Sequence, residues 1–312
     1  MLVAHRRRAE ISKVANGRGA PSLPSGAPVH PTWKDVGGLR MTGFDCVLIP
    51  LDGSDRAEAA LDWVRVLNAR RIRLLRVCPG EDAGEIAAAQ DYLADAAARF
   101  CPPGATSDTR VVVGDVAERI VGEAAEADLI VMSTQGAGDG GRRLFGSVAD
   151  RVSRHAPVPT LLLRGGRAAV PTAPLQRIVV PLDGSPTAER ALPVGANLAT
   201  MLDAPMHLVS VHETAQGEHA AQTDSEIARL NDVAAYLDRE AGGIATGDVR
   251  ASTEVRAGAP DAELLAAVGP GDLLVITTHG RGAARRWKIG RVAEKLLRQA
   301  PAPIVMIRAD DV

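Results

Sequence analysis

The chain has 312 residues, 46% of them apolar and 24% charged, with a formal net charge of −2 at pH 7. This is the composition of a folded globular protein, and the charge balance gives no sign of a nucleic-acid or anionic-membrane partner. No apolar run approaches the ~20 residues that a membrane-spanning helix needs. The three cysteines include no Cys-x-x-Cys pair, so we expect free thiols and a cytoplasmic location.

The N-terminal segment 1–42 differs from the rest of the chain. A basic start, His5–Arg8, is followed by Gly, Pro, Ser and Ala without apolar periodicity. The segment lacks both the apolar stretch of a secretory signal and the hydrophobic content needed to order itself. We therefore predict a disordered extension that is dispensable for stability, with Met41 as the true start.

Five apolar runs of strand length follow, separated by helical patterns. Strands are predicted at Val47–Leu51, Ile72–Val77, Arg110–Val113, Leu129–Met132 and Thr160–Leu163. Apolar residues at helical spacing predict helices at Ala57–Leu67, Glu85–Phe100, Val116–Ala125 and Val148–His155, the last preceded by Ser147. Nearly continuous apolar strands that alternate with helices are typical of a parallel sheet covered on both faces.

The same succession of elements then occurs a second time. Asp52-Gly53-Ser54 returns 131 residues later as Asp183-Gly184-Ser185, and the later segments return at a spacing of 144. Strands of this second repeat are predicted near 177–182, 206–211, 252–256, 273–277 and 303–308. A repeat of this length is the size of a domain. We predict two tandem, doubly wound α/β domains with five-stranded parallel sheets, at 43–164 and 177–312, joined by a linker at 165–176.

The last strand of each repeat, 159–164 and 303–308, is apolar and would lie at the edge of its sheet. An exposed apolar edge invites pairing with another strand. We therefore expect these two strands to pair with each other across a pseudo-two-fold axis, so that the chain forms an intrachain pseudo-dimer.

The Asp-Gly-Ser turns and a Gly-rich loop mark the expected ligand site. In doubly wound sheets, ligands bind at the carboxyl ends of strands where the strand order reverses. The turns follow the first strand of each repeat and the loop follows the fourth, so they should face each other. Asp52 and Asp183 each have two interpretations: a carboxylate that binds a ribose or a base, or an Asx turn that caps the next helix.

The loop after the fourth strand has phosphate-binding character in the first repeat. It runs from Ser133 through Gly136 to Gly146 and Ser147, where a helix begins. Glycines allow close backbone approach, and the N–H groups of a helix N-terminus favour an anion. A flexible surface loop is the alternative. The G-x-G-x-x-G string inside this loop does not follow the first strand, so it does not indicate a dinucleotide fingerprint.

The corresponding loop of the second repeat runs from Thr277 through Gly280 to Gly290 and is more basic. Arg291 stands where the first repeat has Ser147. The basic character fits either a cationic phosphate site or a solvated surface, and the sequence leaves both open. His279 in this loop has no His or Cys companion at metal-ligand spacing.

Together these residues resemble a tandem universal stress protein over about residues 42–312. Nucleotide-binding members of that family carry G-x2-G-x9-G-[ST] after the fourth strand. The first repeat, Ser133-x2-Gly136-x9-Gly146-Ser147, matches three of the four positions, whereas the second, with Thr277 and Arg291 at its ends, matches two. The resemblance implies a Rossmann-like, adenine nucleotide α-hydrolase-like fold and ATP, alone or with Mg²⁺, as a ligand that favours the first repeat.

The resemblance also implies which residues would contact the nucleotide. In the first repeat they are Pro50, Leu51, Asp52, Val77, Met132, Ser133, Gly136, Gly146, Ser147 and Val148. In the second they are Pro181, Leu182, Asp183, Val211, Thr277, Gly280 and Gly290. The sequence offers no nucleophile–base pair and no metal cluster, so no residue is assigned to catalysis or to a metal.

We expect a stress-response regulator or sensor that binds ATP without strong catalytic turnover and acts on a regulatory protein partner, either as a single chain or as a homodimer. The alternative is an interaction module of the same family that binds no nucleotide. A third interpretation, an adenine nucleotide α-hydrolase-type enzyme, is disfavoured because the Ser-Gly-Gly-x-Asp-Ser and His-Ile-Gly-His motifs are absent.

Overall fold

The computed structural model describes residues 43–134, 146–164, 174–213, 224–244, 249–279 and 289–309. The predicted extension 1–42 and most of the predicted linker lie outside these ranges. The strands of the first repeat are β1 (Cys46–Pro50), β2 (Arg71–Cys78), β3 (Thr106–Val113), β4 (Leu129–Ser133) and β5 (Thr160–Leu163). Those of the second are β6 (Arg177–Pro181), β7 (Met206–His212), β8 (Ala251–Ala257), β9 (Asp272–Thr277) and β10 (Ile304–Ile307). Every predicted strand therefore has a counterpart.

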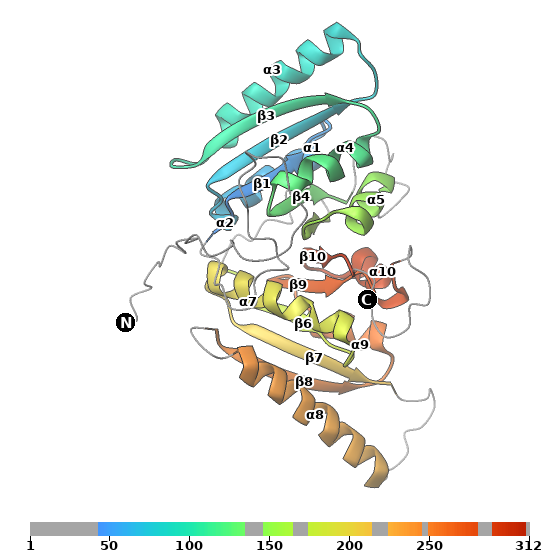
Figure 1. Ribbon diagram of the computed structural model, residues 1–312. Helices are drawn as coiled ribbons and strands as arrows, with labels where there is room; N and C mark the ends of the chain where they lie inside the picture. Colours follow the sequence, from blue (N-terminus) through green and yellow to red (C-terminus); the bar gives the residue numbers. More distant parts are fainter. Residues whose placement is uncertain are drawn as a thin grey trace, which may run out of the picture.

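The strands form one continuous sheet in the order β3-β2-β1-β4-β5-β10-β9-β6-β7-β8 (Figure 1). Each repeat contributes a five-stranded parallel half with the doubly wound order. The two halves join through β5 and β10, which pair antiparallel with Ile304 opposite Leu162 and Met306 opposite Thr160. This is the pairing expected from the two apolar edges, and it covers both of them.

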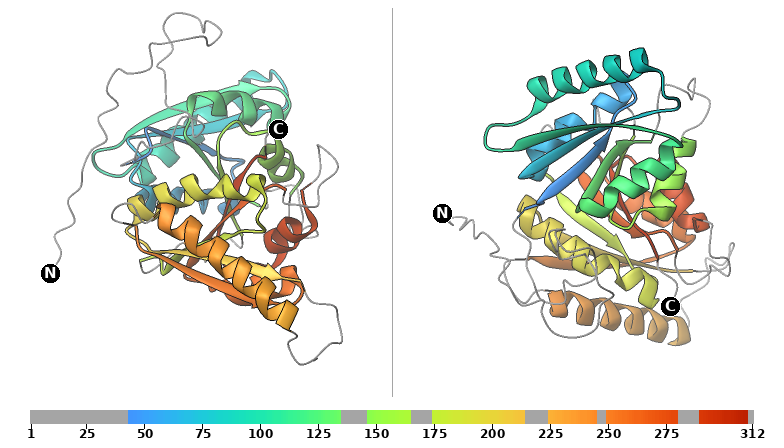
Figure 2. Two further views of the ribbon diagram at one scale, coloured as in Figure 1. Left: turned by 60° about the horizontal axis from the view of Figure 1, so that its bottom comes forward. Right: turned by 45° about the horizontal axis from the view of Figure 1, so that its top comes forward.

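Helices cover both faces of the sheet (Figure 2). Those of the first repeat are α1 (Asp55–Glu58), α2 (Val64–Leu67), α3 (Ala83–Phe100), α4 (Val116–Glu123) and α5 (Ser147–His155). Those of the second are α6 (Pro186–Glu189), α7 (Ala191–Leu202), α8 (Asp224–Ile244), α9 (Pro260–Ala267) and α10 (Arg291–Gln299). Side chains of α3, α7 and α8 pack into the apolar layer on one face, and those of α4, α5, α9 and α10 into the layer on the other.

The helix boundaries of the first repeat differ from the sequence expectation by up to two residues at α3, α4 and α5, and more at the first predicted helix. The segment predicted as one helix over Ala57–Leu67 is interrupted by a 3₁₀ turn at Leu61–Trp63. The N–H of Trp63 bonds to the carbonyl of Ala60, and this bond tightens the chain. Ala60 and Trp63 are both fully buried in the same apolar layer. In addition, the cap of α5 is Gly146 and not Ser147, which is the first residue of the helix.

The core on the first of these faces is continuous between the repeats. Leu161 and Leu163 of β5 and Val305 of β10 belong to the same apolar cluster as Trp63 of the first repeat and Leu198 of the second. All five side chains are at most 1% exposed. The shared cluster means that the two repeats stabilise each other through burial as well as through strand pairing.

Buried polar side chains occur at equivalent places in the two repeats. Arg73 on β2 is 2% exposed and donates to Asp108 and Glu126 at 2.8 Å each. In the second repeat His207 on β7 takes this position, and its ring nitrogens lie 2.9 Å from Ser252 Oγ and Glu254 Oε2. Both groups are paired, as burial of a polar or charged side chain requires.

The network around Glu254 predicts a loss of stability in acid. The hydrogen bond from His207, followed by the charge of Arg256, lowers the pKa of Glu254 below its ordinary value. A carboxyl whose pKa is lower in the folded state than in the unfolded state stabilises the fold at pH values above its unfolded pKa, about 4.3. This contribution to stability is lost as the pH falls through the folded-state pKa. Urea denaturation should therefore show stability falling below about pH 4. The free energy of unfolding of Glu254→Gln should fall less steeply with pH than that of the parent. Parallel curves of unfolding free energy against pH for the two proteins would contradict this assignment.

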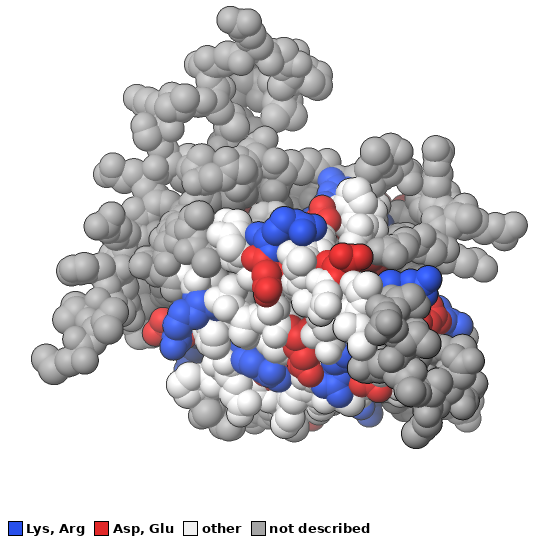
Figure 3. Space-filling view, turned by 90° about the horizontal axis from the view of Figure 1, so that it is seen from below, with Lys and Arg blue, Asp and Glu red and all other residues white. Residues whose placement is uncertain are grey.

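Charges of both signs are interspersed on the face seen in Figure 3. Among the described residues drawn there, no large patch of a single sign is visible, so this face does not carry the basic footprint of a nucleic-acid-binding surface. Within the part of the chain that the structure describes, no helix has the length and apolar character to cross a membrane.

Candidate functional site

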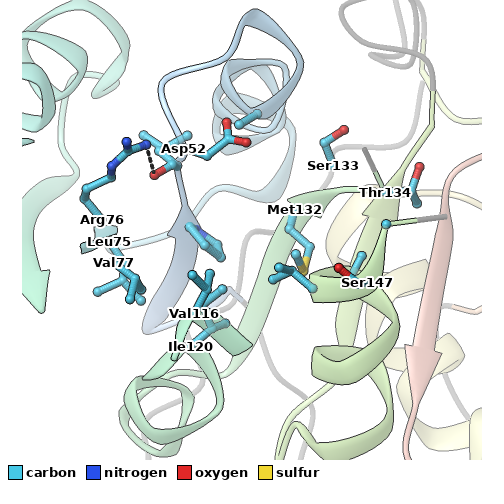
Figure 4. A pocket seen from close by; sticks show the side chains of 16 residues that line it. Asp52, Leu75, Arg76, Val77, Val116, Ile120, Met132, Ser133, Thr134 and Ser147 are labelled. Carbon is cyan, nitrogen blue, oxygen red and sulfur yellow. Dashed lines mark hydrogen bonds between the residues drawn. The ribbon is translucent and has the colours of Figure 1, made fainter. Parts of the chain in front are cut away.

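A cavity of about 420 Å³ lies at the carboxyl edge of the first repeat, between the ends of β1 and β4, where the strand order reverses. This volume is within the range of small-molecule sites. The strand ends of β1, β2 and β4 form its floor, and α4 and α5 form its walls (Figure 4). Its lining comprises Pro50, Leu51, Asp52, Ala57, Leu75, Arg76, Val77, Val116, Ile120, Met132, Ser133, Thr134, Gly146, Ser147, Val148 and Ala149.

The structure brings together, in this one cavity, nine of the ten residues that the sequence singled out in the first repeat. They are Pro50, Leu51, Asp52, Val77, Met132, Ser133, Gly146, Ser147 and Val148. Gly136 lies outside the described residues, as does Gly280 of the second repeat.

Asp52 forms an Asx turn and also lines the cavity. Its Oδ1 accepts from the Ser54 N–H at 3.0 Å and from Ser54 Oγ at 2.6 Å. Ser54 Oγ in turn accepts from the Ala57 N–H and caps α1. Gly53 between them has φ +82°, a conformation that favours glycine. The Asx turn is therefore present, with Ser54 as the helix cap, and the turn holds the Asp52 carboxylate at the cavity edge.

The N-terminus of α5 faces the cavity at its other end. Gly146 caps the helix without a side-chain hydrogen bond, and Ser147, Val148 and Ala149 of the first turn line the cavity. The N–H groups of a first helical turn have no partner inside the helix, and the helix dipole makes this end positive. The arrangement can hold an anion.

An ion pair fixes α4 relative to α5. Asp115 caps α4 by accepting from the Glu118 N–H, and its other oxygen accepts from Arg151 of α5 at 2.9 Å. The bond from Arg151, followed by the bond from the Glu118 N–H, lowers the pKa of Asp115. The pair joins the two helices whose first turns line the cavity.

Several cavity residues were not predicted from the sequence. Arg76, near the end of β2, donates from Nη1 to the Leu51 carbonyl at 3.3 Å and adds a positive charge to the cavity lining (Figure 4). Val116 and Ile120 of α4 form an apolar wall. The sequence predicted the helix, but its apolar spacing does not say which of its residues reach a ligand site. Ala57, Leu75, Thr134 and Ala149 complete the additions.

The second repeat has the same backbone frame with different side chains. Leu182 N–H bonds to the Val209 carbonyl at 2.8 Å, as Leu51 does to Leu75. Asp183 repeats the Asx turn: its Oδ1 accepts from the Ser185 N–H at 2.9 Å and from Ser185 Oγ at 2.6 Å. The register places Ser210 where the first repeat has Arg76.

The other predicted residues of the second repeat occupy the corresponding edge. Pro181 ends β6, Val211 lies near the end of β7, and Gly290 caps α10. Thr277, at the end of β9, donates from Oγ1 to the carbonyl of His279 at 2.7 Å. This hydroxyl is therefore committed within its own chain segment.

Among the described residues, acidic and metal-binding side chains do not gather at either site. Within the described ranges, no group of three or more His, Cys, Asp or Glu side chains is arranged to hold a metal ion. The three cysteines form no disulfide, and burial raises the pKa of the Cys46 thiol.

Comparison with known families decides the affiliation. The model of the universal stress protein family matches the chain twice, over residues 43–164 and 174–308. The chain belongs to the universal stress protein family. The tandem organisation recognised from the repeated Asp-Gly-Ser turns is therefore shown, as is the doubly wound α/β fold.

Individual members of the family are similar to this chain over different lengths. A universal stress protein of Mycobacterium tuberculosis is 27% identical over 192 residues, which cover 59% of this chain and 62% of the relative, a little less than two thirds of its length. A universal stress protein of Mycolicibacterium smegmatis is 24% identical over 84% of this chain and 96% of the relative. The crystal structure of a universal stress protein from Archaeoglobus fulgidus superimposes with a TM-score of 0.63 at 19% identity, covering 85% of this chain and 97% of that one, so it shares the fold.

Proposed function

We propose that the first repeat binds an adenine nucleotide, with ATP as the leading candidate, and that binding serves a sensing or regulatory role. The observation that carries the proposal is the cavity between β1, β2, β4, α4 and α5, which combines an apolar wall, a carboxylate and an uncapped helix N-terminus. A nucleotide has the complementary parts: a base with apolar faces, a ribose with hydroxyl donors, and phosphates.

Each part of the cavity supplies a different kind of contact. Val77, Val116 and Ile120 would bury the faces of the base, and Asp52 would accept a hydrogen bond from the ribose. The first turn of α5 would direct its N–H groups and the Ser147 hydroxyl at a phosphate. A bound Mg²⁺ would neutralise phosphate charge, and its remaining ligands would be water because the described residues hold no acidic cluster.

We propose that the bound nucleotide is not turned over. The described cavity residues include the hydroxyls of Ser133, Thr134 and Ser147 but no His, Lys or Cys to activate them. Asp52, the carboxylate of the described lining, is held in an Asx turn by Ser54. A nucleophile without a base within hydrogen-bond reach is weak. Binding energy would then serve to stabilise one state of the protein that a regulatory partner recognises.

The second repeat is proposed to bind the nucleotide more weakly. Ser210 replaces Arg76, Arg291 replaces Ser147, and the Thr277 hydroxyl is bonded to the His279 carbonyl. The N-terminus of α10 is similarly uncapped by side chains, so the difference between the repeats lies in the side chains around a shared backbone frame.

The experiment that tests the proposal asks whether nucleotide accompanies the protein. Protein purified without added ligand is acid-treated, and the released small molecules are separated by chromatography. Calorimetry then measures the binding of ATP, AMP and GTP, with and without Mg²⁺. We expect adenine nucleotides to bind with about one equivalent per chain. Absence of binding by all three would favour the alternative, an interaction module of this family that acts without nucleotide.

A further inference from the structure

We propose that Thr134 contacts the ligand, and that its hydroxyl donates a hydrogen bond to the anionic group held at the N-terminus of α5. The proposal rests on the nucleotide binding proposed above and names a residue that the motif of the family does not include. It comes from a difference between two threonines at equivalent places, Thr134 in the first repeat and Thr278 in the second.

The backbone around the two threonines is the same. Thr134 N–H bonds to the Leu163 carbonyl at 2.8 Å, and its own carbonyl accepts from Gly146 N–H at 2.6 Å. Thr278 N–H bonds to the Ile307 carbonyl at 2.9 Å, and its carbonyl accepts from Gly290 N–H at 2.8 Å. Each threonine thus links the last strand of its repeat to the cap of the following helix.

Among the described residues, the two hydroxyls have different partners; the first-repeat counterparts of Ala309 and His279, Gly165 and Gln135, lie outside the described ranges. Thr278 Oγ1 accepts from Ala309 N–H at 3.0 Å and lies 3.0 Å from His279 Nδ1. Thr134 is only 2% exposed, and its Oγ1 has no hydrogen-bond partner among the described residues. Thr134 lines the cavity, whereas the Thr278 hydroxyl is already used to hold the chain after β10.

An unpaired buried hydroxyl destabilises a fold, so its presence calls for an explanation. Thr134 lies on the β4–α5 side of the cavity with Ser147, away from Val116 and Ile120 of the apolar wall (Figure 4). The neighbouring donors are the N–H groups of the α5 first turn, whose cap Gly146 is bonded to the Thr134 carbonyl. A hydroxyl can donate to a phosphate oxygen, and such a charge-assisted bond is stronger than a neutral one. The unpaired hydroxyl and the helix end therefore form one subsite for an anion.

The test combines a change in the protein with a change in the ligand. Calorimetry measures the affinities of AMP and adenosine, two ligands that differ by the phosphate, for the full-length parent and for Thr134→Val. Valine keeps the shape and removes the hydroxyl. We expect AMP affinity to fall about tenfold while adenosine affinity changes less than about twofold. Thr134→Ser restores the hydroxyl and should retain the AMP affinity.

The matched control is Thr278→Val, which should leave AMP affinity unchanged. The thermal stability of the ligand-free proteins gives a second readout. Thr278→Val should lower Tm by about 2–4 °C because it removes the acceptor of Ala309 N–H, whereas Thr134→Val should not lower Tm. Unchanged AMP affinity in Thr134→Val, or an equal loss for AMP and adenosine, would overturn the proposal while nucleotide binding stands. A parent protein that binds neither AMP nor ATP would remove the proposed function, and this proposal with it.

Discussion

Gly146→Val is expected to abolish most nucleotide binding, with a loss of at least about 2–3 kcal/mol. Gly146 caps α5 and lines the cavity beside the residues of its first turn. A branched side chain at this place would occupy the space through which a phosphate reaches the helix N–H groups. The φ of −71° is one that valine adopts, so the loss should come from blocked access and not from backbone strain. Calorimetric titration with ATP measures the effect.

Gly290→Val in the second repeat is the matched comparison. A Cβ at Gly290 would meet the Thr278 carbonyl oxygen at 3.6 Å and His279 Cα at 3.9 Å, which are ordinary contact distances. This variant should fold normally and bind about as much ATP as the parent, because the second repeat is expected to contribute little. Equal losses in the two variants would show that both repeats bind, and the proposed asymmetry would be wrong.

Arg177→Met is expected to lower the free energy of unfolding by about 3–5 kcal/mol. Arg177 forms a two-pronged pair with Asp272, with Nε to Oδ1 at 3.1 Å and Nη2 to Oδ2 at 2.7 Å. Asp272 is completely buried. Methionine would fill much of the space but leave this carboxylate without a countercharge, and the bond from Arg177 to the Ala267 carbonyl would also be lost. Urea denaturation at pH 7 measures the change.

Two further variants separate the effect of the unpaired buried charge on stability from the effect of losing any arginine. Adding Asp272→Asn to Arg177→Met should recover a large part of the stability, because an amide carries no charge and can still accept from the Gly269 N–H. Arg298 and Glu294 form an ion pair in which the side chains are 50% and 51% exposed. Arg298→Met breaks this pair and should lower the free energy of unfolding by less than about 1 kcal/mol. A loss in Arg177→Met as small as that of Arg298→Met would refute the role given to Asp272.

The sequence alone predicted the parts of this protein that depend on local pattern and repetition. Continuous apolar runs located the central strands, since burial on both faces of a parallel sheet leaves no room for polar alternation. The edge strand β8, whose sequence ASTEVRA is largely polar, was located from the repeat. The Asp-Gly-Ser turns located the carboxyl ends of β1 and β6, because the turn needs a glycine at positive φ and a side chain to cap the next helix. The resemblance to the family, supported by the spacing of glycines after β4, then implied ten site residues in the first repeat, and the structure places nine of them around one cavity.

The tertiary structure decided what lies between elements that are distant in the chain. Arg76 lines the cavity because the register of β2 against β1 sets its guanidinium beside the Leu51 carbonyl. Thr278 Oγ1 accepts from the Ala309 N–H, which lies far along the chain, and the local sequence Thr-Thr does not predict this bond any more than Ser-Thr predicts the hydroxyl of Thr134, which has no partner among the described residues. Apolar periodicity fixes which side of a strand or helix is buried, but not which foreign atoms it meets. Those partners, and the chemistry of the site with them, follow from the packing of the whole domain.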